Sequence, residues 1–201
     1  MSVQERPATA VISAGDLWEI GDVLALARGE ATVELPSDAT WLATIERGSQ
    51  RVEALWREDR VVYGVTTGYG ASGGRAVPGH LVDELPSHLI RYHGCGLGDA
   101  FDSEATAAVL GVRLRSLARG CSGVRLCLLE QLAGLLNHRV LPVIPQEGSV
   151  GASGDLTPLS YVAAVLQGER EVLHGAGRRP AAEALRAAGL KPLRLGPKEA
   201  L

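Results

Sequence analysis

The sequence predicts a mainly helical protein. Apolar residues recur at helical spacing along most of its 201 residues, and glycine or proline clusters separate these stretches. With 46% hydrophobic and 21% charged residues, the chain can bury one substantial core. It shows no internal repeat. We therefore expect one helical domain over residues 1–201, with a glycine-rich loop and a candidate short hairpin.

Four helices are expected before residue 120. The first is expected over 16–27, and Gly29 suits its end. The second begins after Ser37, a good N-cap residue, and continues to Trp56, although a glycine at position 48 weakens its middle. The other two are expected over 78–93 and over 102–119, the latter capped by Asp102 or Ser103.

A loop is expected over residues 61–77, because the helical pattern stops there. Glycine recurs at Gly64, Gly68 and Gly70, with β-branched residues among them. Each glycine lowers helix stability by about 1 kcal/mol relative to alanine. This segment is therefore expected to connect helices.

The C-terminal part is expected to hold three more helices and the hairpin. Ser122 suits the N-cap of a helix that carries Leu128, Leu132 and Leu136. An apolar helix is expected from Asp155 to Leu166. The remaining elements are a hairpin over 170–179 and a short helix over 180–189.

Composition argues against several classes of function. A net charge of −3 and a pI near 6.0 give no attraction for nucleic acid or for an anionic membrane. No stretch reaches the roughly 18 consecutive apolar residues of a membrane span, and the N-terminus lacks a signal-peptide pattern. Cys95, Cys121 and Cys127 form no Cys-x-x-Cys, so we expect reduced thiols, no metal site and a cytoplasmic location.

Residues 148–155, Gly-Ser-Val-Gly-Ala-Ser-Gly-Asp, are the most informative run in the chain. Within it Ala152-Ser153-Gly154 can cyclise, because Gly154 lacks a Cβ and its amide nitrogen can approach the Ala152 carbonyl carbon. Loss of two waters, one from that carbonyl and one from the Ser153 hydroxyl, would give a methylidene-imidazolone. The helix that follows would direct its N-terminal dipole at this electrophile. Taken alone, the tripeptide is better explained as a glycine-rich turn that caps the helix.

Four motifs together resemble those of the aromatic amino-acid ammonia-lyase and aminomutase family. The run 148–160 is similar to the family's signature. The other three are Tyr-Gly-Val-Thr-Thr-Gly-Tyr-Gly at 63–70, Ser-His-Leu-Ile-Arg-Tyr-His-Gly-Cys-Gly at 87–96 and Pro-Lys-Glu-Ala-Leu at 197–201. They occur in the family's order. The resemblance implies the N-terminal helical part of the ammonia-lyase fold, with residues 61–77 as its active-site loop.

The resemblance also implies a non-oxidative deamination without an external cofactor. An aromatic L-amino acid (tyrosine, histidine or phenylalanine) would lose ammonia and become the α,β-unsaturated acid. The autocatalytic 4-methylidene-imidazol-5-one from Ala152-Ser153-Gly154 would react with the substrate amine and make it a better leaving group. A base must remove the weakly acidic β-proton.

Tyr63 occupies the family's catalytic tyrosine position, so the resemblance implies that Tyr63 is this base. A phenol is a weak base at neutral pH, and its surroundings must therefore favour the phenolate. The glycine-rich loop around Tyr63 fits a lid that closes over substrate. The alternative is an ordinary, half-buried loop tyrosine.

Four further residues match positions that line the family's substrate pocket. Tyr92-His93 falls where the family places the pair around the substrate ring, although histidine lyases resemble Ser-His there, tyrosine lyases His-Leu and phenylalanine lyases Phe-Leu. His93 could contact an imidazole or a phenol hydroxyl, or could instead bond the last carbonyls of its helix. Gly70 and Leu156 also match, with a turn glycine and a core leucine as their alternatives.

Three hypotheses about function follow. Family members extend well beyond a segment like 197–201, form homotetramers and combine residues from three subunits in each active site. The first hypothesis is therefore an ammonia-lyase segment that needs a C-terminal half or a complementary chain. The second is an aromatic amino-acid 2,3-aminomutase, which re-adds ammonia at the β-carbon and which the sequence does not separate from a lyase. The third is an inactive truncated fragment or a helical module that binds lyase subunits.

Overall fold

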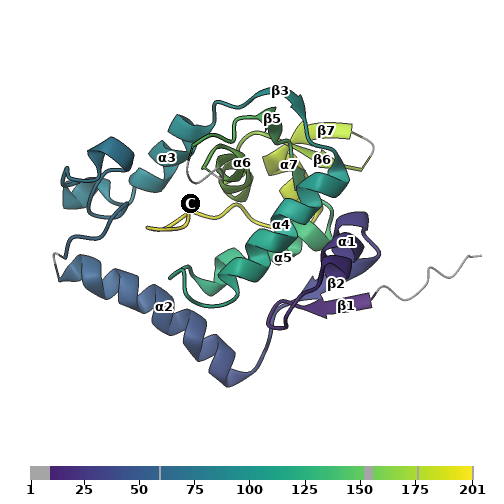
Figure 1. Ribbon diagram of the computed structural model, residues 1–201, viewed down its shortest axis with the longest axis horizontal. Helices are drawn as coiled ribbons and strands as arrows, with labels where there is room; N and C mark the ends of the chain where they lie inside the picture. Colours follow the sequence, from purple (N-terminus) through teal and green to yellow (C-terminus); the bar gives the residue numbers. More distant parts are fainter. Residues whose placement is uncertain (1–9, 59, 152–155, 176, 201) are drawn as a thin grey trace, which may run out of the picture.

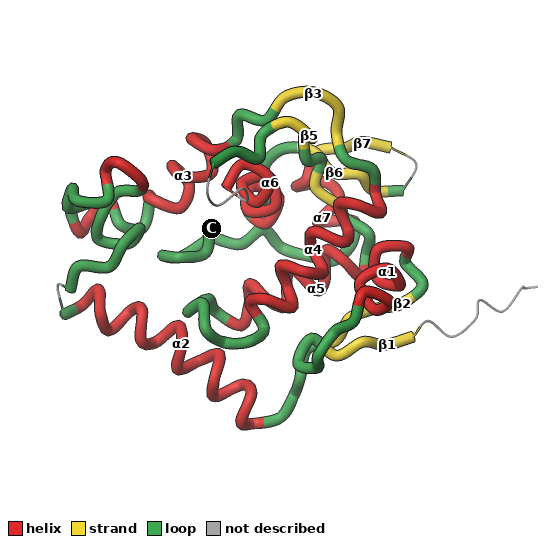
Figure 2. Tube along the Cα trace, in the orientation of Figure 1, coloured by secondary structure: helices red, strands yellow, loops and turns green. Residues whose placement is uncertain are grey.

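The computed structural model describes residues 10–58, 60–151, 156–175 and 177–200. Within these ranges helices predominate over strands (Figure 2), and seven of the helices are α-helices. The strands form three small sheets. The prediction of a mainly helical protein is confirmed.

The N-terminal end holds a parallel strand pair that the helical pattern does not predict. Strands β1 (Ala10–Ser13) and β2 (Ala31–Glu34) pair in register from Ala10 with Ala31 to Ser13 with Glu34. Helix α1 (Ile20–Arg28) connects them, and it packs against α4 (Ser103–Leu117). Each strand has four residues, too few for a clear period-two signal in the sequence.

Helix α1 begins later than its predicted start at residue 16. A capping box sets its start, because the Glu19 N–H donates to Oδ2 of Asp22 at 2.8 Å. Leu17 is left outside the helix and is 90% exposed. Gly29 ends the helix with φ +74°, as predicted.

Helix α2 (Ala39–Arg57) matches its prediction except at the N-cap. Oδ1 of Asp38, not the hydroxyl of Ser37, accepts a hydrogen bond from the Trp41 N–H at 2.8 Å. Gly48 does not interrupt the helix. A Cβ at Gly48 would lie 3.0 Å from the carbonyl oxygen of Gly120, so glycine permits a close approach to the connection after α4.

The predicted loop follows α2, and it contains two short 3₁₀ turns, at Gly70–Ser72 and Gly79–Leu81. The helix predicted over 78–93 is shorter than expected: α3 spans Leu85–His93. Its second residue is Pro86, whose fixed φ and missing N–H suit the first turn of a helix. The proline that begins this helix is therefore Pro86 and not Pro78.

Helices α4 (Ser103–Leu117) and α5 (Leu126–Asn137) pack against each other in the core. Oδ1 of Asp102 accepts from the Ala105 N–H at 2.7 Å, which confirms the predicted cap. The predicted start of α5 at Ser122 is wrong. Gly123 has φ +69°, and this left-handed conformation keeps residues 122–125 out of the helix.

Helix α6 (Leu156–Leu166) contacts α3 and α5. Eight of its eleven residues are buried, as expected for a predominantly apolar helix in the core. The main hydrophobic cluster also takes its largest buried side chains from α4 and α5, among them Leu110, Leu114, Leu128, Leu129, Leu132 and Leu135.

The remaining strands are antiparallel. Strand β3 (Leu97–Ala100) pairs with β5 (Pro145–Glu147). The second sheet has the order β4-β6-β7, with β4 at Leu141–Pro142. Strands β6 (Glu171–His174) and β7 (Gly177–Pro180) form the predicted hairpin. The last predicted helix is α7, at Ala181–Ala187.

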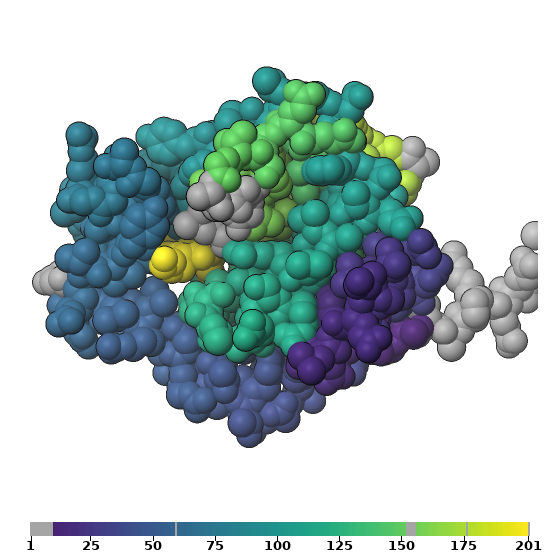
Figure 3. Space-filling view, in the orientation of Figure 1, coloured from purple at the N-terminus to yellow at the C-terminus, as the bar shows by residue number. Residues whose placement is uncertain are grey.

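The C-terminal segment, residues 188–200 after α7, runs back into the middle of the molecule. In Figure 1 it passes between α3 and α5. Helix α2 runs below it in this view, on the side away from α3. Figure 3 shows the yellow surface of this segment in a hollow between the blue residues of the α2 side and the teal residues of α4 and α5. None of the described helices is long and apolar enough to cross a membrane.

Candidate active site

Tyr63 lies in the loop after α2, and its own motif holds it in place. Its hydroxyl accepts a hydrogen bond from the Gly70 N–H at 2.9 Å. Its ring meets the Tyr69 ring edge to face, with centroids 6.2 Å apart. The side chain is 53% exposed. Tyr63 and Gly70, both predicted site residues, are therefore in direct contact and open to solvent.

Tyr69 stabilises the backbone on the other side of Tyr63. Its hydroxyl donates to the carbonyl oxygen of Gly64 at 3.1 Å. Burial, with a smaller contribution from Tyr63, raises the pKa of Tyr69 to about 12, so this phenol stays protonated and keeps donating at neutral pH. Gly64 has φ +70°, and a Cβ there would lie 2.6 Å from the Tyr69 ring. The motif therefore needs glycine at position 64.

Lys198 of the C-terminal segment reaches the Tyr63 ring. Its Nζ lies over the ring, 5.8 Å from the centroid, which is within the range of a cation–π interaction. Lys198 has φ +72°, an uncommon conformation for a residue with a side chain. The motif at 197–201 therefore places a positive charge beside the predicted base.

Arg125 and Glu199 fix the segment that carries Lys198. Nε and Nη2 of Arg125 donate to the two carboxylate oxygens of Glu199 at 2.9 and 2.5 Å. The carboxylate also accepts from the backbone N–H groups of Arg125 and Gly196, at 3.0 and 2.6 Å. The Glu199 side chain is 1% exposed, and its hydrogen bond raises the pKa of Arg125. A buried carboxylate with this many donors holds the segment firmly.

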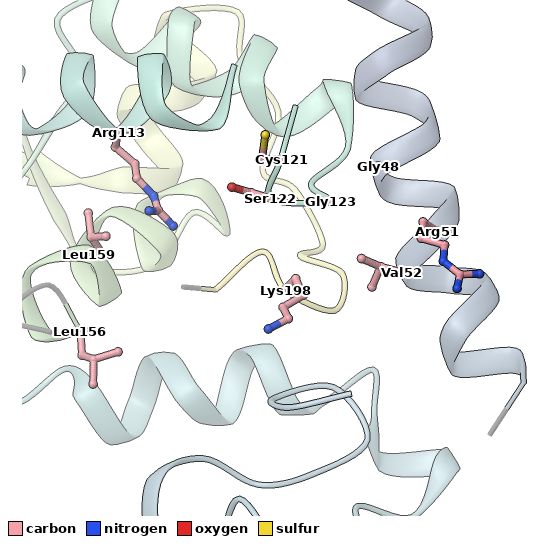
Figure 4. A pocket seen from close by; sticks show the side chains of 10 residues that line it. All are labelled: Gly48, Arg51, Val52, Arg113, Cys121, Ser122, Gly123, Leu156, Leu159 and Lys198. Atoms are coloured by element: carbon pink, nitrogen blue, oxygen red, sulfur yellow. The ribbon is translucent and has the colours of Figure 1, made fainter. Parts of the chain in front are cut away.

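A cavity of about 670 Å³ lies beside this segment. Figure 4 shows Lys198 between Val52 of α2 and Leu156 of α6, whereas Arg51 points away from the other side chains. Leu156 is 38% exposed and lines this cavity, so it does not fill the core. The other described lining residues are Gly48, Arg113, Cys121, Ser122, Gly123 and Leu159.

The predicted electrophile, Ala152-Ser153-Gly154, lies outside the described residues. The residues on either side of it fit such a group. Helix α6 begins at Leu156, directly after residues 152–155, and the amides of a helix N-terminus favour negative charge nearby. Before the tripeptide, a Cβ at Gly148 would lie 2.5 Å from Cγ2 of Thr157, so the chain passes close to the first turn of α6.

Tyr92 and His93 lie at the end of α3, and neither is among the described residues that line the cavity. Tyr92 is 76% exposed. Nδ1 of His93 is 3.1 Å from the carbonyl oxygen of Leu89, the contact expected of a histidine at a helix end. The structure therefore brings Tyr63 and Gly70 together and places Leu156 on the cavity beside Lys198. Like Tyr92 and His93, the Tyr63–Gly70 pair is not among the described residues that line this cavity.

Sequence reasoning assigned no role to Lys198, Glu199 or Arg125. The motif at 197–201 resembles one of the family's motifs and so marks this segment as important. No local pattern, however, indicates that its lysine contacts Tyr63. The pairing of Arg125 with Glu199 joins residues 74 positions apart. Within the described part of the chain, no group of three His, Cys, Asp or Glu side chains could hold a metal ion.

Solved structures resemble this chain along nearly its whole length. Tyrosine aminomutase from Streptomyces globisporus has a TM-score of 0.86 and 36% identity, over 96% of this chain and 36% of that one. Ergothionase from Treponema denticola, an ergothioneine-degrading enzyme, has a TM-score of 0.89 and 26% identity, over 94% of this chain and 38% of that one.

The sequence relatives of this chain include histidine ammonia-lyases. Histidine ammonia-lyase from Gloeobacter violaceus is 46% identical over 182 residues, which are 90% of this chain and 35% of that protein. Histidine ammonia-lyase from a Geobacillus strain is 44% identical over 80% of this chain and 32% of that protein. The chain thus spans about a third of the length of the relatives that it matches. The family model for aromatic amino acid lyases matches residues 18–201, and the chain belongs to that family.

Proposed function

We propose that this chain carries the base and the electrophile of an ammonia-lyase that removes ammonia from an aromatic L-amino acid. The observation that carries the proposal is the position of Tyr63, whose exposed hydroxyl is held by Gly70 and whose ring lies under a lysine. Membership in the aromatic amino acid lyase family supports the reaction class.

Tyr63 removes the proton from the substrate β-carbon in this proposal. A general base must lie within hydrogen-bond reach of the proton that it takes, and a hydroxyl on an exposed loop can meet a bound substrate in this way. The methylidene-imidazolone formed from Ala152, Ser153 and Gly154 supplies an electron-poor carbon that activates the substrate amine as a leaving group. Leu156 and the apolar part of the cavity exclude water from the substrate ring.

Histidine is the first substrate to test, because one relative named histidine ammonia-lyase is 46% identical to this chain. His93 could contact an imidazole or a phenol hydroxyl, while Tyr92 makes the adjoining position bulkier than a serine would. Tyrosine and phenylalanine are therefore the second and third substrates.

An aromatic amino-acid 2,3-aminomutase is the second candidate. The observation that favours it is the 36% identity to the tyrosine aminomutase of Streptomyces globisporus. Both reactions begin with elimination, and they differ in whether ammonia is added again at the β-carbon. Tyr63 would have the same role in both.

Activity is expected to need more protein than these 201 residues. We propose that the remainder comes from further residues of the same protein or from a complementary chain, assembled as a homo-oligomer such as a tetramer. The cavity beside Lys198 is bordered by α2, α6 and the C-terminal segment, and such a partner would complete it.

The test is an elimination assay with histidine, tyrosine and phenylalanine. The protein is assayed alone and with a candidate C-terminal chain, and ultraviolet absorbance follows the α,β-unsaturated acid. We expect that acid from one of the three substrates, and chiral analysis for a β-amino acid separates the lyase from the aminomutase. Absence of both products from every combination would contradict the proposal and favour an inactive fragment or a lyase-binding module.

A further inference from the structure

The ammonium group of Lys198 places a positive charge on the Tyr63 ring. It lies over the ring at 5.8 Å from the centroid. The described residues offer it no carboxylate within salt-bridge distance, and no carboxylate is among the residues that line the cavity beside it. Its charge is therefore not neutralised by a described neighbour.

The position of Lys198 is built into the fold. Glu199, the next residue, is buried and receives donors from the side chain and backbone of Arg125 and from the backbone of Gly196. The Lys198 backbone is left-handed, with φ +72°. Local strain of this kind is kept only where the surrounding structure enforces it, and it is frequent at functional sites.

The remaining charged and titratable groups near this contact come from several elements. Tyr69 packs against the Tyr63 ring from the same loop. Arg51 of α2, Arg113 of α4 and Cys121 line the cavity. Arg51 points away from Lys198 (Figure 4). Lys198 is a cation of this cavity lining whose ammonium group lies over the Tyr63 ring.

We propose that Lys198 is a positioning residue for Tyr63: it orients the phenol ring and stabilises the phenolate that acts as the base. This inference rests on the proposed function. A positive charge beside a phenol favours its ionised form, and a cation over an aromatic face, here 5.8 Å from the ring centroid, fixes the ring's orientation. Lys198 keeps its own proton throughout. The β-proton moves to the Tyr63 oxygen, the C–H electrons form the carbon–carbon double bond, and ammonia leaves with the electrons of the C–N bond.

The chain offers a matched control for this charge. It contains two lysines, and the other one, Lys191, is exposed and contributes only its backbone carbonyl to a hydrogen bond, with Gln131. The variants K198M and K191M therefore remove the same charge and keep a similar side-chain length. The variant K198R keeps the charge at the same position.

The first readout is the pH dependence of elimination in the active assembly. We expect K198M to lower kcat about tenfold near neutral pH and to move the acidic limb of the rate profile to higher pH by about one unit. KM should change little, K198R should restore most of kcat, and K191M should match the wild type. A K198M profile that overlays the wild-type profile would overturn the proposal, as would a fall in kcat at every pH without a shift of the acidic limb.

The second readout needs no catalysis. Protons above the face of an aromatic ring resonate upfield, so the ε-methylene protons of Lys198 should be shifted upfield in the NMR spectrum of the chain, and Tyr63→Leu should remove that shift. The Lys191 signals should not respond to Tyr63→Leu. An upfield shift in a protein that eliminates nothing would refute the lyase proposal and retain the contact, whereas an active enzyme without the shift would refute the role of Lys198.

Discussion

The α4–α5–α6 core and the loop that carries Tyr63 are built in different ways. In the core, leucines such as Leu129 and Leu135 are 0% exposed and pack against other apolar side chains. In the loop, glycines and hydroxyl groups satisfy the backbone through short-range hydrogen bonds, for example from the Val62 N–H to Oγ1 of Thr66 at 2.8 Å. Stability is therefore concentrated in the helices, while the reactive group stands exposed on the loop.

This difference predicts which substitutions change the free energy of unfolding and which change catalysis. A change in the core should alter the free energy of unfolding and leave the chemistry of each folded molecule intact. A change at Tyr63 should do the reverse. The C-terminal segment links the two regions, because Arg125 at the start of α5 holds Glu199 and the next residue back, Lys198, reaches Tyr63.

The largest expected effect is on catalysis, from Tyr63→Phe. Loss of a general base costs roughly 100- to 10,000-fold in kcat, whereas loss of the hydrogen bond from the Gly70 N–H costs only about 1 kcal/mol of stability. Steady-state kinetics and chemical denaturation of the same protein measure both. A variant that is destabilised but fully active would show that Tyr63 has a structural role and not a catalytic one.

The next effect is on stability, from Leu129→Ala in α5. A buried leucine that is cut back to alanine leaves a cavity and costs about 2–5 kcal/mol. The matched control is Leu17→Ala, since Leu17 is 90% exposed and should cost less than about 0.5 kcal/mol. Denaturant midpoints should separate the two variants, and equal midpoints would show that Leu129 does not belong to a tightly packed core.

Arg125→Met tests the link between the two regions. It removes the guanidinium from the buried Glu199 carboxylate, which keeps only backbone donors. Because the Arg125 side chain is 47% exposed, we expect a loss of about 3 kcal/mol, the low end for a broken buried pair. The comparison variant is Arg57→Met, which breaks an exposed pair with Glu53 and should cost less than about 1 kcal/mol. Thermal denaturation measures both. If Arg125→Met were as mild as Arg57→Met, the segment would not be held by this pair.

The smallest effect is expected from Tyr69→Phe, and it depends on pH. At neutral pH the variant loses one hydrogen bond, to Gly64, worth about 1 kcal/mol. Because burial raises the pKa of Tyr69 from 10.0 to about 12 in the folded state, the unfolded chain ionises first as the pH rises. The stability due to this group is therefore full below pH 10 and is lost as the pH rises to about 12.

Denaturation at a series of alkaline pH values checks this prediction. Wild-type stability should fall more steeply between pH 10 and 12 than the stability of Tyr69→Phe. Tyr92→Phe is the control, because Tyr92 is 76% exposed and should keep the wild-type slope. A Tyr69→Phe slope equal to that of the wild type would show that Tyr69 is not buried in the folded loop.

Local chemistry made much of the fold predictable. Gly29 and Asp102 identified a helix end and a helix start, because capping depends on neighbouring residues. The error at Ser122 arose because a good capping residue lies beside Gly123, whose left-handed conformation cannot be read from composition. The β1–β2 pair was missed, since its strands are short and joined through a helix.

The site was predictable only where its contacts are local. Tyr63 and Gly70 lie in one motif, so the motif alone placed them together. The contact of Lys198 with Tyr63 joins residues 135 positions apart, and it depends on packing that no sequence pattern encodes. The roles of Tyr63, Gly70, Leu156 and the Tyr92–His93 pair toward a substrate stay predictions, and of these residues only Leu156 is among the described residues lining the cavity.

Intact mass with peptide mapping across residues 148–160 tests whether this chain forms the electrophile that acts together with the base Tyr63. We predict a deficit of two waters, located at Ala152-Ser153-Gly154, in protein that unfolds cooperatively. An unmodified tripeptide in protein that unfolds cooperatively would contradict this prediction and leave a folded helical chain without its reactive group.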